Sequence, residues 1–81
     1  MDRPQILAQL STIMQEVLDD PELSLTPATT ADDVEGWDSM SNITFVVEVE
    51  RRFAIKFNTA EIEEMRNVGD MLDMIADKRA A

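Results

Sequence analysis

Hydrophobic residues recur with the period of an α-helix over residues 4–19. They fall three or four positions apart and polar residues fill the intervening positions, which is the pattern of an amphipathic helix. Pro4 suits the first helical turn, and Pro21 follows the expected end. The inward face of this helix is predicted to consist of Ile6, Leu7, Leu10, Ile13, Met14, Val17 and Leu18.

A second helical pattern covers residues 39–53, "SMSNITFVVEVERRF". The stretch is rich in β-branched residues, so a strand is the competing interpretation. The three- and four-residue spacings, and the Glu48–Arg52 pair one turn apart, favour a helix. Either Asp38 or Ser39 can cap its start. Its apolar side is predicted to be formed by Ile43, Val46, Val47, Val49 and Phe53.

Two further helices are expected toward the C-terminus. A capping pattern that begins at Asn58 precedes a short helix over 59–65, and another that begins at Asn67 precedes a helix over 68–79. The sequence therefore predicts a single all-α domain over residues 1–81. Its fold class is a four-helix bundle with three longer helices and a short third one.

The connection between the first two helices is long and irregular. Its sequence, "DPELSLTPATTADDVEGWD", sustains neither a helical nor a strand period. A connection of this length in so small a domain is often functional. Leu23, Leu25 and Val34 are expected to anchor it to the core.

Composition narrows the possible chemistry. The chain has no cysteine and no histidine, so it lacks a thiolate nucleophile, the usual zinc ligands and the usual base for a serine nucleophile. Its 17 acidic and 7 basic residues give a net charge of −10. This charge disfavours nucleic acid and favours basic protein surfaces. No apolar run approaches the roughly 20 residues of a membrane span. We expect a cytoplasmic monomer that does not insert into membranes.

The stretch "ADDVEGWDSMSN" was compared with a calcium-binding loop, because such loops place a glycine at their sixth position. With Gly36 at that position, Ala31 takes the first ligand position and Asn42 the bidentate one. The pattern fails at both ends, and no resident metal is expected.

"GWDSM" places Ser39 at the start of the second predicted helix. A hydroxyl there either caps the helix or is modified by another enzyme that supplies the base. With the long connection before it and the apolar helix ending "ERRFAIKF" after it, this motif resembles the acyl carrier protein family. That family's signature is Asp-Ser-Leu, or less often Asp-Ser-Met, at the start of helix two. The resemblance runs without gaps from about residue 33 to residue 76.

The resemblance implies a non-catalytic carrier. Ser39 would receive 4'-phosphopantetheine from coenzyme A through a transferase, which uses Mg²⁺ that the carrier itself does not hold. The thiol of this cofactor would carry acyl groups as thioesters, as in fatty acid biosynthesis and other lipid metabolism. The expected partners are that transferase and the acyl-loading and acyl-using enzymes, which have basic surfaces.

The second predicted helix departs from the family pattern. Housekeeping fatty-acid carriers have a strongly acidic exposed side there, whereas this chain has Ser41, Thr44, Arg51 and Arg52. Arginine in place of an acid repels a basic partner, so we expect a carrier specialised for a lipid, polyketide or envelope-polymer pathway. The candidate partner-recognition residues are Trp37, Asp38, Met40, Thr44, Val47 and Arg51.

Several alternatives remain open at this point. Asp-Ser-Met also resembles the D-alanyl carrier proteins, which would make the cargo an aminoacyl group. An unmodified acidic helical adaptor is a further possibility. Trp37 can pack the loop against the bundle or contact partners. An acyl chain could slip between the second and third helices among predicted core residues, namely Phe45, Val46, Phe57, Ile62 and Met65.

Overall fold

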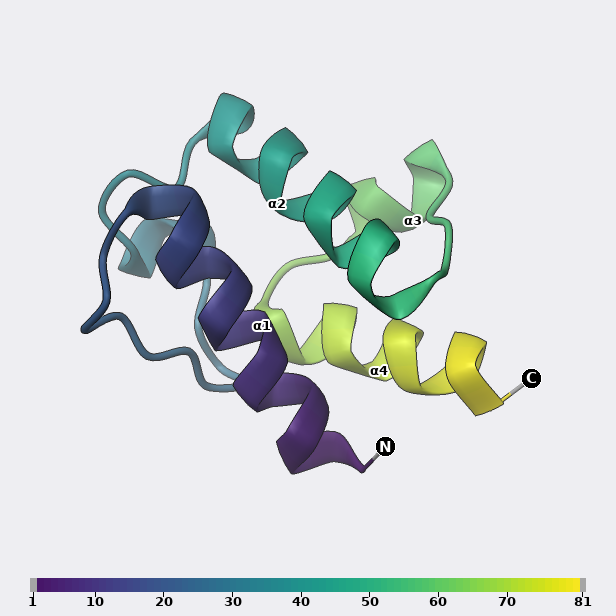
Figure 1. The fold of residues 1–81 in the computed structure, drawn as a ribbon. Helices are drawn as coiled ribbons and strands as arrows, with labels where there is room; N and C mark the ends of the chain where they lie inside the picture. The colour runs from purple at the N-terminus through teal and green to yellow at the C-terminus, as the bar shows by residue number, and fades with distance from the viewer. Residues whose placement is uncertain (1, 81) are drawn as a thin grey trace.

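The computed structural model describes residues 2–80 and consists of helices joined by loops (Figure 1). The elements are α1 (Arg3–Leu18), η1 (Ala31–Asp33), α2 (Ser39–Phe53), α3 (Thr59–Glu64) and α4 (Val68–Ala80). The short η1 is a turn of 3-10 helix inside the long connection. In Figure 1, α2 crosses the top of the molecule, and α1 and α4 lie below it. The prediction of an all-α, four-helix bundle with a short third helix is confirmed.

Both ends of α1 are set by local hydrogen bonds. The Asp2 carboxylate accepts the N–H of Gln5 at 2.9 Å, and the Gln5 side-chain oxygen accepts the N–H of Asp2 at 2.9 Å. This reciprocal cap makes Arg3 the first helical residue, one position before the predicted start. The helix ends at Leu18 because Asp19 adopts a left-handed conformation, with φ of 53°, and bonds back to the last turn.

The core lies where α1 packs against α2 and α4. On α1, four of the predicted inward residues are fully buried, whereas Leu7, Val17 and Leu18 are only partly buried at its edge. The buried core side chains are Ile6, Leu10, Ile13, Met14, Leu25, Val34, Phe45, Val46, Val49, Phe53, Phe57, Val68, Met71, Leu72 and Ile75.

The predicted apolar side of α2 was wrong at two positions. Ile43 is 64% exposed and Val47 is 46% exposed, while Phe45 is completely buried. The apolar run of α2 is compatible with more than one helical face, and the face that meets the rest of the bundle carries Phe45 and Val49. Ile43 and Val47 therefore remain on the outer surface.

The long connection is held to α1 by side chains and by two side-chain-to-backbone hydrogen bonds. Leu25 and Val34 are buried and Leu23 is partly buried, as predicted for anchors. The Ser11 hydroxyl accepts the N–H of Leu25 at 3.2 Å, and the Gln15 amide donates to the carbonyl of Leu23 at 2.7 Å. The two hydrogen bonds bind the first part of the irregular segment to a regular helix.

The same connection also caps α4. The carbonyl of Thr29 accepts the N–H of Val68 at 2.9 Å, and that of Pro27 accepts the N–H of Gly69 at 2.8 Å. A Cβ at position 69 would lie 2.9 Å from the Pro27 oxygen, which is too close, so glycine is needed there. The connection thus satisfies N–H groups that a helix start leaves without intrahelical partners.

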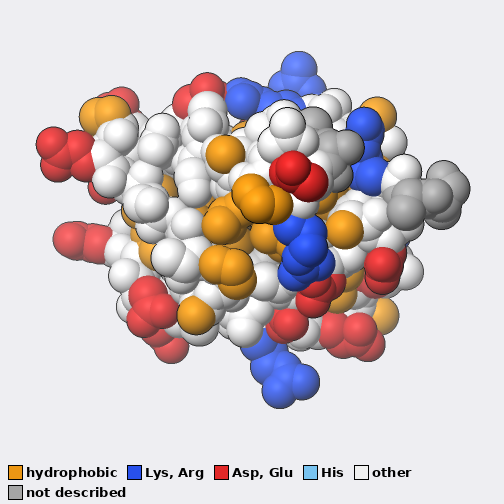
Figure 2. Space-filling view, turned by 90° about the horizontal axis from the view of Figure 1, so that it is seen from below, with side chains coloured by type: hydrophobic (Ala, Val, Ile, Leu, Met, Phe, Trp, Pro, Cys, Tyr) orange, Lys and Arg blue, Asp and Glu red, His pale blue; other side chains and the backbone are white. Residues whose placement is uncertain are grey.

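The surface is acidic without one dominant acidic patch in the view from below. Figure 2 shows hydrophobic side chains near the centre of that face, bordered on one side by acidic and basic side chains, with further Asp and Glu spread toward its margin. Within residues 2–80, no helix combines the length and apolar character needed to cross a bilayer.

Alanine substitutions on α2 should separate its two faces. Phe45→Ala removes a completely buried ring and is expected to lower the free energy of unfolding by about 3–5 kcal/mol. Ile43→Ala, on the outer face, is expected to cost less than about 1 kcal/mol. Urea titrations followed by circular dichroism measure both values. A loss at Ile43 as large as that at Phe45 would contradict this assignment of faces.

Candidate functional site

The start of α2 is fixed by a reciprocal cap between Asp38 and Ser41. The Asp38 carboxylate accepts the N–H of Met40 at 3.0 Å and that of Ser41 at 2.9 Å. In return, the Ser41 hydroxyl oxygen accepts the N–H of Asp38 at 2.8 Å. The sequence allowed either Asp38 or Ser39 to be the capping residue, and the structure shows that it is Asp38.

Ser39 is the first residue of α2, and its side chain is exposed. Its hydroxyl makes no hydrogen bond with any residue in the part of the chain that the structure describes. By contrast, the Ser41 hydroxyl also lies 2.8 Å from the carbonyl oxygen of Gly36, to which it can donate. Ser41 therefore completes the cap of this helix, and the Ser39 hydroxyl remains available for covalent modification.

Trp37 joins the loop before Ser39 to the bundle. Its ring is partly buried and meets the ring of Phe45 edge-on, with centroids 5.5 Å apart. The Trp37 Nε1–H donates to Asn42 Oδ1 at 3.0 Å. Gly36, with φ of +89°, provides the left-handed turn that leads into this arrangement. Loop packing is therefore one role of Trp37.

The carboxyl group of Asp38 is held in its ionised form. The backbone N–H of Ser41 and then the Ser41 hydroxyl contribute most to lowering the pKa of Asp38. The N–H of Met40 adds a smaller part, and together these hydrogen bonds outweigh the opposing effect of desolvation. A carboxylate that already accepts hydrogen bonds in this way is a poor base for a neighbouring hydroxyl. Asp38 positions the helix start and does not replace the missing histidine.

A cleft of about 360 Å³ adjoins Ser39. Residues of α2, η1, α3 and the start of α4 line it, which places the cleft between the second and third helices and their neighbours. Ile62 and Met65 were predicted core residues, and the structure finds them only partly buried, on the wall of this cleft. Its apolar lining consists of Ala31, Trp37, Phe45, Val46, Ile62, Met65, Val68 and Met71, and its polar lining of Asp38, Ser39, Asn42, Arg66 and Asn67.

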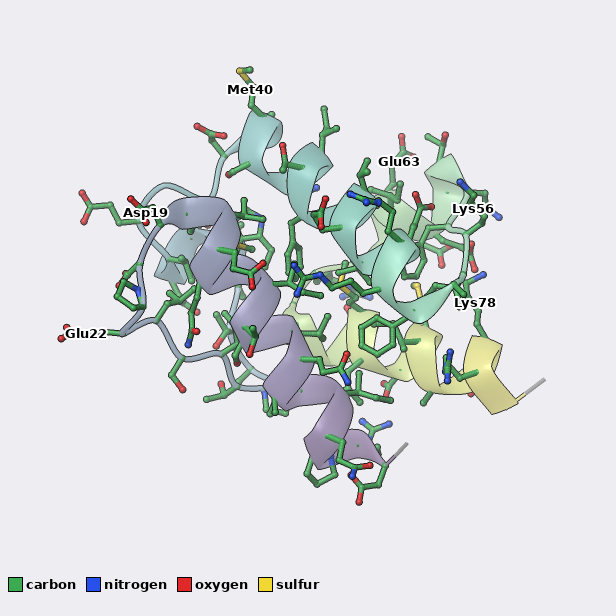
Figure 3. All side chains as sticks on the ribbon, viewed as in Figure 1. Asp19, Glu22, Met40, Lys56, Glu63 and Lys78 are labelled. Carbon is green, nitrogen blue, oxygen red and sulfur yellow. The ribbon has the colours of Figure 1, made fainter. Side chains whose placement is uncertain are left out.

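An apolar stripe runs along the outer face of α2 from the residue after Ser39. Met40 is 79% exposed and points away from the body of the molecule (Figure 3). Ile43 and Val47 continue the stripe at helical spacing, and exposed Thr44 lies among them. Met40, Thr44 and Val47 thus share one accessible surface with Ser39, whereas Ile43 was assigned to the interior from sequence.

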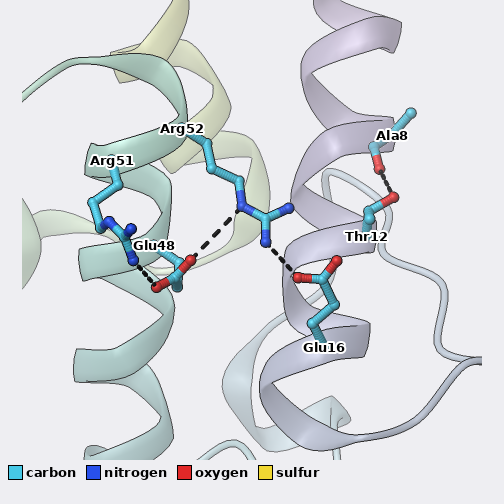
Figure 4. Close-up of polar contacts among 6 residues, drawn as sticks. All are labelled: Ala8, Thr12, Glu16, Glu48, Arg51 and Arg52. Carbon is cyan, nitrogen blue, oxygen red and sulfur yellow. Dashed lines mark hydrogen bonds and ion pairs between the residues drawn. The ribbon is translucent and has the colours of Figure 1, made fainter.

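The charges of α2 largely neutralise one another (Figure 4). Glu48 pairs with Arg51 at 3.0 Å and with Arg52 at 3.7 Å, and Arg52 also binds Glu16 of α1. The other acid, Glu50, accepts a backbone N–H of the loop beyond α2 at 2.8 Å. Both acidic residues of this helix are therefore engaged within the protein, while the Arg51 side chain is 73% exposed.

Sequence reasoning did not identify Ser41, Asn42, Arg66 or Asn67 as parts of this site. The spacing of Asp38 and Ser41 is that of a reciprocal cap and could have been found. The other three residues converge only through the fold. Among residues 2–80, no group of three potential metal ligands lies close enough to hold a metal ion.

The chain was compared with known families and structures. The family model described as "Phosphopantetheine attachment site" matches residues 8–75. The chain belongs to the acyl carrier protein family. It is 30% identical over 82 residues to an acyl carrier protein of Thermosynechococcus vestitus, covering 100% of both chains. With an acyl carrier protein of Thermotoga maritima it is 29% identical, covering 94% of each chain.

A solved structure agrees with this assignment. The solution NMR structure of a holo acyl carrier protein from Geobacter metallireducens superposes with a TM-score of 0.87 at 37% identity. The match covers 93% of this chain and 86% of the other. The carrier is therefore a non-catalytic protein with a 4'-phosphopantetheine prosthetic group, and it acts with a phosphopantetheinyl transferase and acyl-handling enzymes. A free hydroxyl at an accessible helix start, beside a cleft, fits the attachment of such a group.

The stabilising effect of the Asp38 charge should depend on pH. Because the folded protein lowers the pKa of Asp38, the ionised group stabilises the fold above about pH 4, and this contribution disappears as pH falls through the lowered pKa. Asp38→Asn keeps a capping side chain but cannot ionise. Wild type should be more stable than this variant at pH 7, and the difference should shrink below about pH 4.

Urea unfolding at a series of pH values measures this difference. Glu63→Gln serves as the matched control because the Glu63 carboxylate makes no hydrogen bond or ion pair with other described residues, so it reports the loss of one charge alone. A difference between wild type and Asp38→Asn that does not change between pH 7 and pH 2 would contradict the assigned role of the charge.

Proposed function

We propose that Ser39 is the attachment residue and that the chain presents thioester-bound acyl intermediates to partner enzymes. The free Ser39 hydroxyl at the first position of α2 carries this proposal, because the cap has been taken over by Asp38 and Ser41. The exposed side chain can enter the active site of another enzyme without any part of the bundle unfolding.

The attachment requires a base that the partner supplies. Ser39 Oγ attacks the pantetheine-linked phosphorus of coenzyme A, the Oγ–P bond forms, and the P–O bond to 3',5'-ADP breaks. The hydroxyl proton passes to a base of the transferase, and 3',5'-ADP leaves. The positive end of the helix dipole at the start of α2 favours the phosphodiester that results. When bound, the group supplies the thiol that holds cargo as a thioester.

The α2 surface supports a specialised partner set. Its acids Glu48 and Glu50 are engaged within the fold, whereas Arg51 is exposed next to the apolar stripe. Acids elsewhere still attract basic partner surfaces, and Arg51 disfavours those that place a cation opposite it. Partner contacts are proposed for Trp37, Asp38, Met40, Thr44, Val47 and Arg51.

The pathway is proposed to be one of lipid, polyketide or envelope-polymer synthesis, with the carrier acting as a cytoplasmic monomer. An aminoacyl cargo, as in D-alanyl carriers, is the second candidate because the motif is Asp-Ser-Met. Intact mass of the protein purified from its native cell would identify the cargo. A fatty or hydroxyacyl increment supports the first candidate, and an amino acid increment supports the second.

Incubation with coenzyme A, Mg²⁺ and a broad-specificity transferase tests the attachment residue. Wild type should gain the mass of one phosphopantetheine, and Ser39→Ala should gain none. Ser41→Ala is the matched control, because it removes a neighbouring hydroxyl that takes part in the cap but leaves Ser39 in place. The assignment would be refuted if the Ser39→Ala protein gained the phosphopantetheine mass, or if wild type did not gain it.

Competition with a housekeeping carrier tests the specialised role. The holo protein should support a housekeeping fatty-acid synthase with a kcat/KM roughly tenfold or more below that of the housekeeping carrier, and Arg51→Glu should recover part of the loss. Arg3→Glu is the control for net charge, because it changes the charge by the same amount. Arg3 lies on α1, away from the α2 surface, and pairs with Asp73 of α4. Equal activity of wild type and the housekeeping carrier would disprove the specialised role.

A further inference from the structure

The polar rim of the cleft beside Ser39 offers hydrogen-bond donors whose acceptor atoms are already used. Asn42 Oδ1 accepts the indole N–H of Trp37 at 3.0 Å, and Asn67 Oδ1 accepts the N–H of Asp70 at 2.9 Å. Both partners can only donate, which fixes the orientation of each side-chain amide. The two NH₂ groups make no hydrogen bond with the described part of the chain, and both residues line the cleft.

Arg66 adds a positive charge to this rim. It is exposed, lines the cleft, and its guanidinium group has no partner among residues 2–80. This is unusual in a chain with 17 acids, because nearly every other cation has one. The paired cations are Arg3 with Asp73, Arg51 and Arg52 with Glu48, Lys78 with Glu61, and Arg79 with the carbonyl of Phe53.

The other charged residue that lines the cleft is Asp38. It is the only acid among the described residues of the lining, and one oxygen of its carboxylate already accepts the N–H groups of Met40 and Ser41. The rim therefore carries free N–H donors on Asn42, Arg66 and Asn67, whereas Asp38 keeps a single carboxylate oxygen that accepts no hydrogen bond from the described residues. An oxyanion satisfies such a site, and arginine is the side chain best suited to bind carboxylate or phosphate oxygens.

We propose that Asn42, Arg66 and Asn67 form an oxyanion-binding rim that draws the arm on Ser39 into the cleft. This rests on the proposed attachment at Ser39. The anion is carried by the arm itself, either as the phosphodiester or as a carboxylate on the cargo. The phosphodiester begins one bond from Ser39 Oγ, and Ser39 lines the same cleft. A cleft of about 360 Å³ lies within the range of pockets that enclose small ligands.

The proposal predicts the class of cargo that the bundle retains. An acyl group that bears a carboxylate can fill the apolar part of the cleft with its chain while the rim binds its anionic end. A plain alkyl chain of the same length gains only the apolar contacts. The carrier should therefore shield a carboxyacyl thioester better than the matching alkyl thioester.

Three defined loaded forms allow this to be tested. A broad-specificity transferase is used to attach the arm from coenzyme A, hexanoyl-coenzyme A or adipoyl-coenzyme A, and intact mass confirms one arm per chain. The side-chain N–H signals of Asn42, Arg66 and Asn67 are then compared by ¹⁵N NMR with those of the unmodified protein. A shift in all three forms identifies the phosphodiester as the anion, and a shift in the adipoyl form alone identifies the cargo carboxylate.

Other outcomes overturn the proposal. Signals that stay unchanged in every form, or that move equally with hexanoyl and adipoyl cargo but not with the bare arm, would show that no oxyanion is bound. A chain that takes up no arm at Ser39 would instead refute the proposed function, so the two failures are distinguishable.

Variants provide an independent measurement through the rate at which hydroxylamine cleaves the thioester. In wild type the adipoyl form should be cleaved more slowly than the hexanoyl form, and Arg66→Gln should accelerate adipoyl cleavage by up to about tenfold. Asn67→Asp keeps the acceptor that caps α4 but replaces the free donors with a carboxylate, and should act in the same direction. If a phosphodiester is the only anion bound, the same variants should instead reverse the NMR shift of the bare-arm form.

Arg51→Gln is the matched control, since Arg51 is an exposed arginine that does not line this cleft. Circular dichroism melts establish that each variant is folded, and Arg66→Lys, which retains the charge, should keep part of the effect. Arg66→Gln that changes neither the cleavage rate nor the NMR signals, in a folded and loaded protein, would overturn the proposal.

Discussion

The reciprocal cap between Asp38 and Ser41 is the interaction on which the site depends. A helix start needs side-chain acceptors for its free N–H groups, and a serine at that position normally serves this purpose. Here Asp38 accepts two of those N–H groups and Ser41 completes the cap, so Ser39 keeps an exposed hydroxyl with no structural duty. The proposed acceptor for phosphopantetheine is thereby obtained from an ordinary helix terminus, in a chain that contains no histidine.

The long connection also fixes the start of α4, which forms another wall of the cleft. Its carbonyls at Pro27 and Thr29 cap the start of α4, and its last residues carry Trp37, which is bonded to Asn42 of α2. One irregular segment therefore sets the positions of both helix starts that border the cleft. Gly69 makes this possible, because any side chain there would push the connection away. The sequence pattern shows only that this connection is long and irregular. In the structure it is the element that joins the core to the site.

Much of the fold could be predicted from hydrophobic spacing, because α1 and α4 each have one clear apolar face. Hydrophobic spacing gave the wrong inward face for part of α2, because its dense run of apolar residues fits several helical faces. Ile43 was predicted to be inside and is exposed. The family motif was enough to single out Ser39. The absence of hydrogen bonds to its hydroxyl could not be predicted from the sequence. Asn42 and Arg66 could not be found, because they line one cleft only when α2 and the segment before α4 meet in the fold. Local patterns report which face is apolar, and tertiary contacts decide which polar atoms remain unsatisfied.

Two different surfaces can then set the specificity of one carrier. The outer face of α2 combines an apolar stripe with exposed Arg51, which is the proposed basis for discrimination between partner enzymes by their charge. The cleft also adjoins Ser39 and presents N–H donors, which are the proposed basis for discrimination between the groups that the arm carries. An arm whose anion is held in the cleft must be released before a partner can receive the cargo. A partner that occupies the face of α2 next to Ser39 is well placed to favour that release, which would couple recognition of the enzyme to delivery of the acyl group.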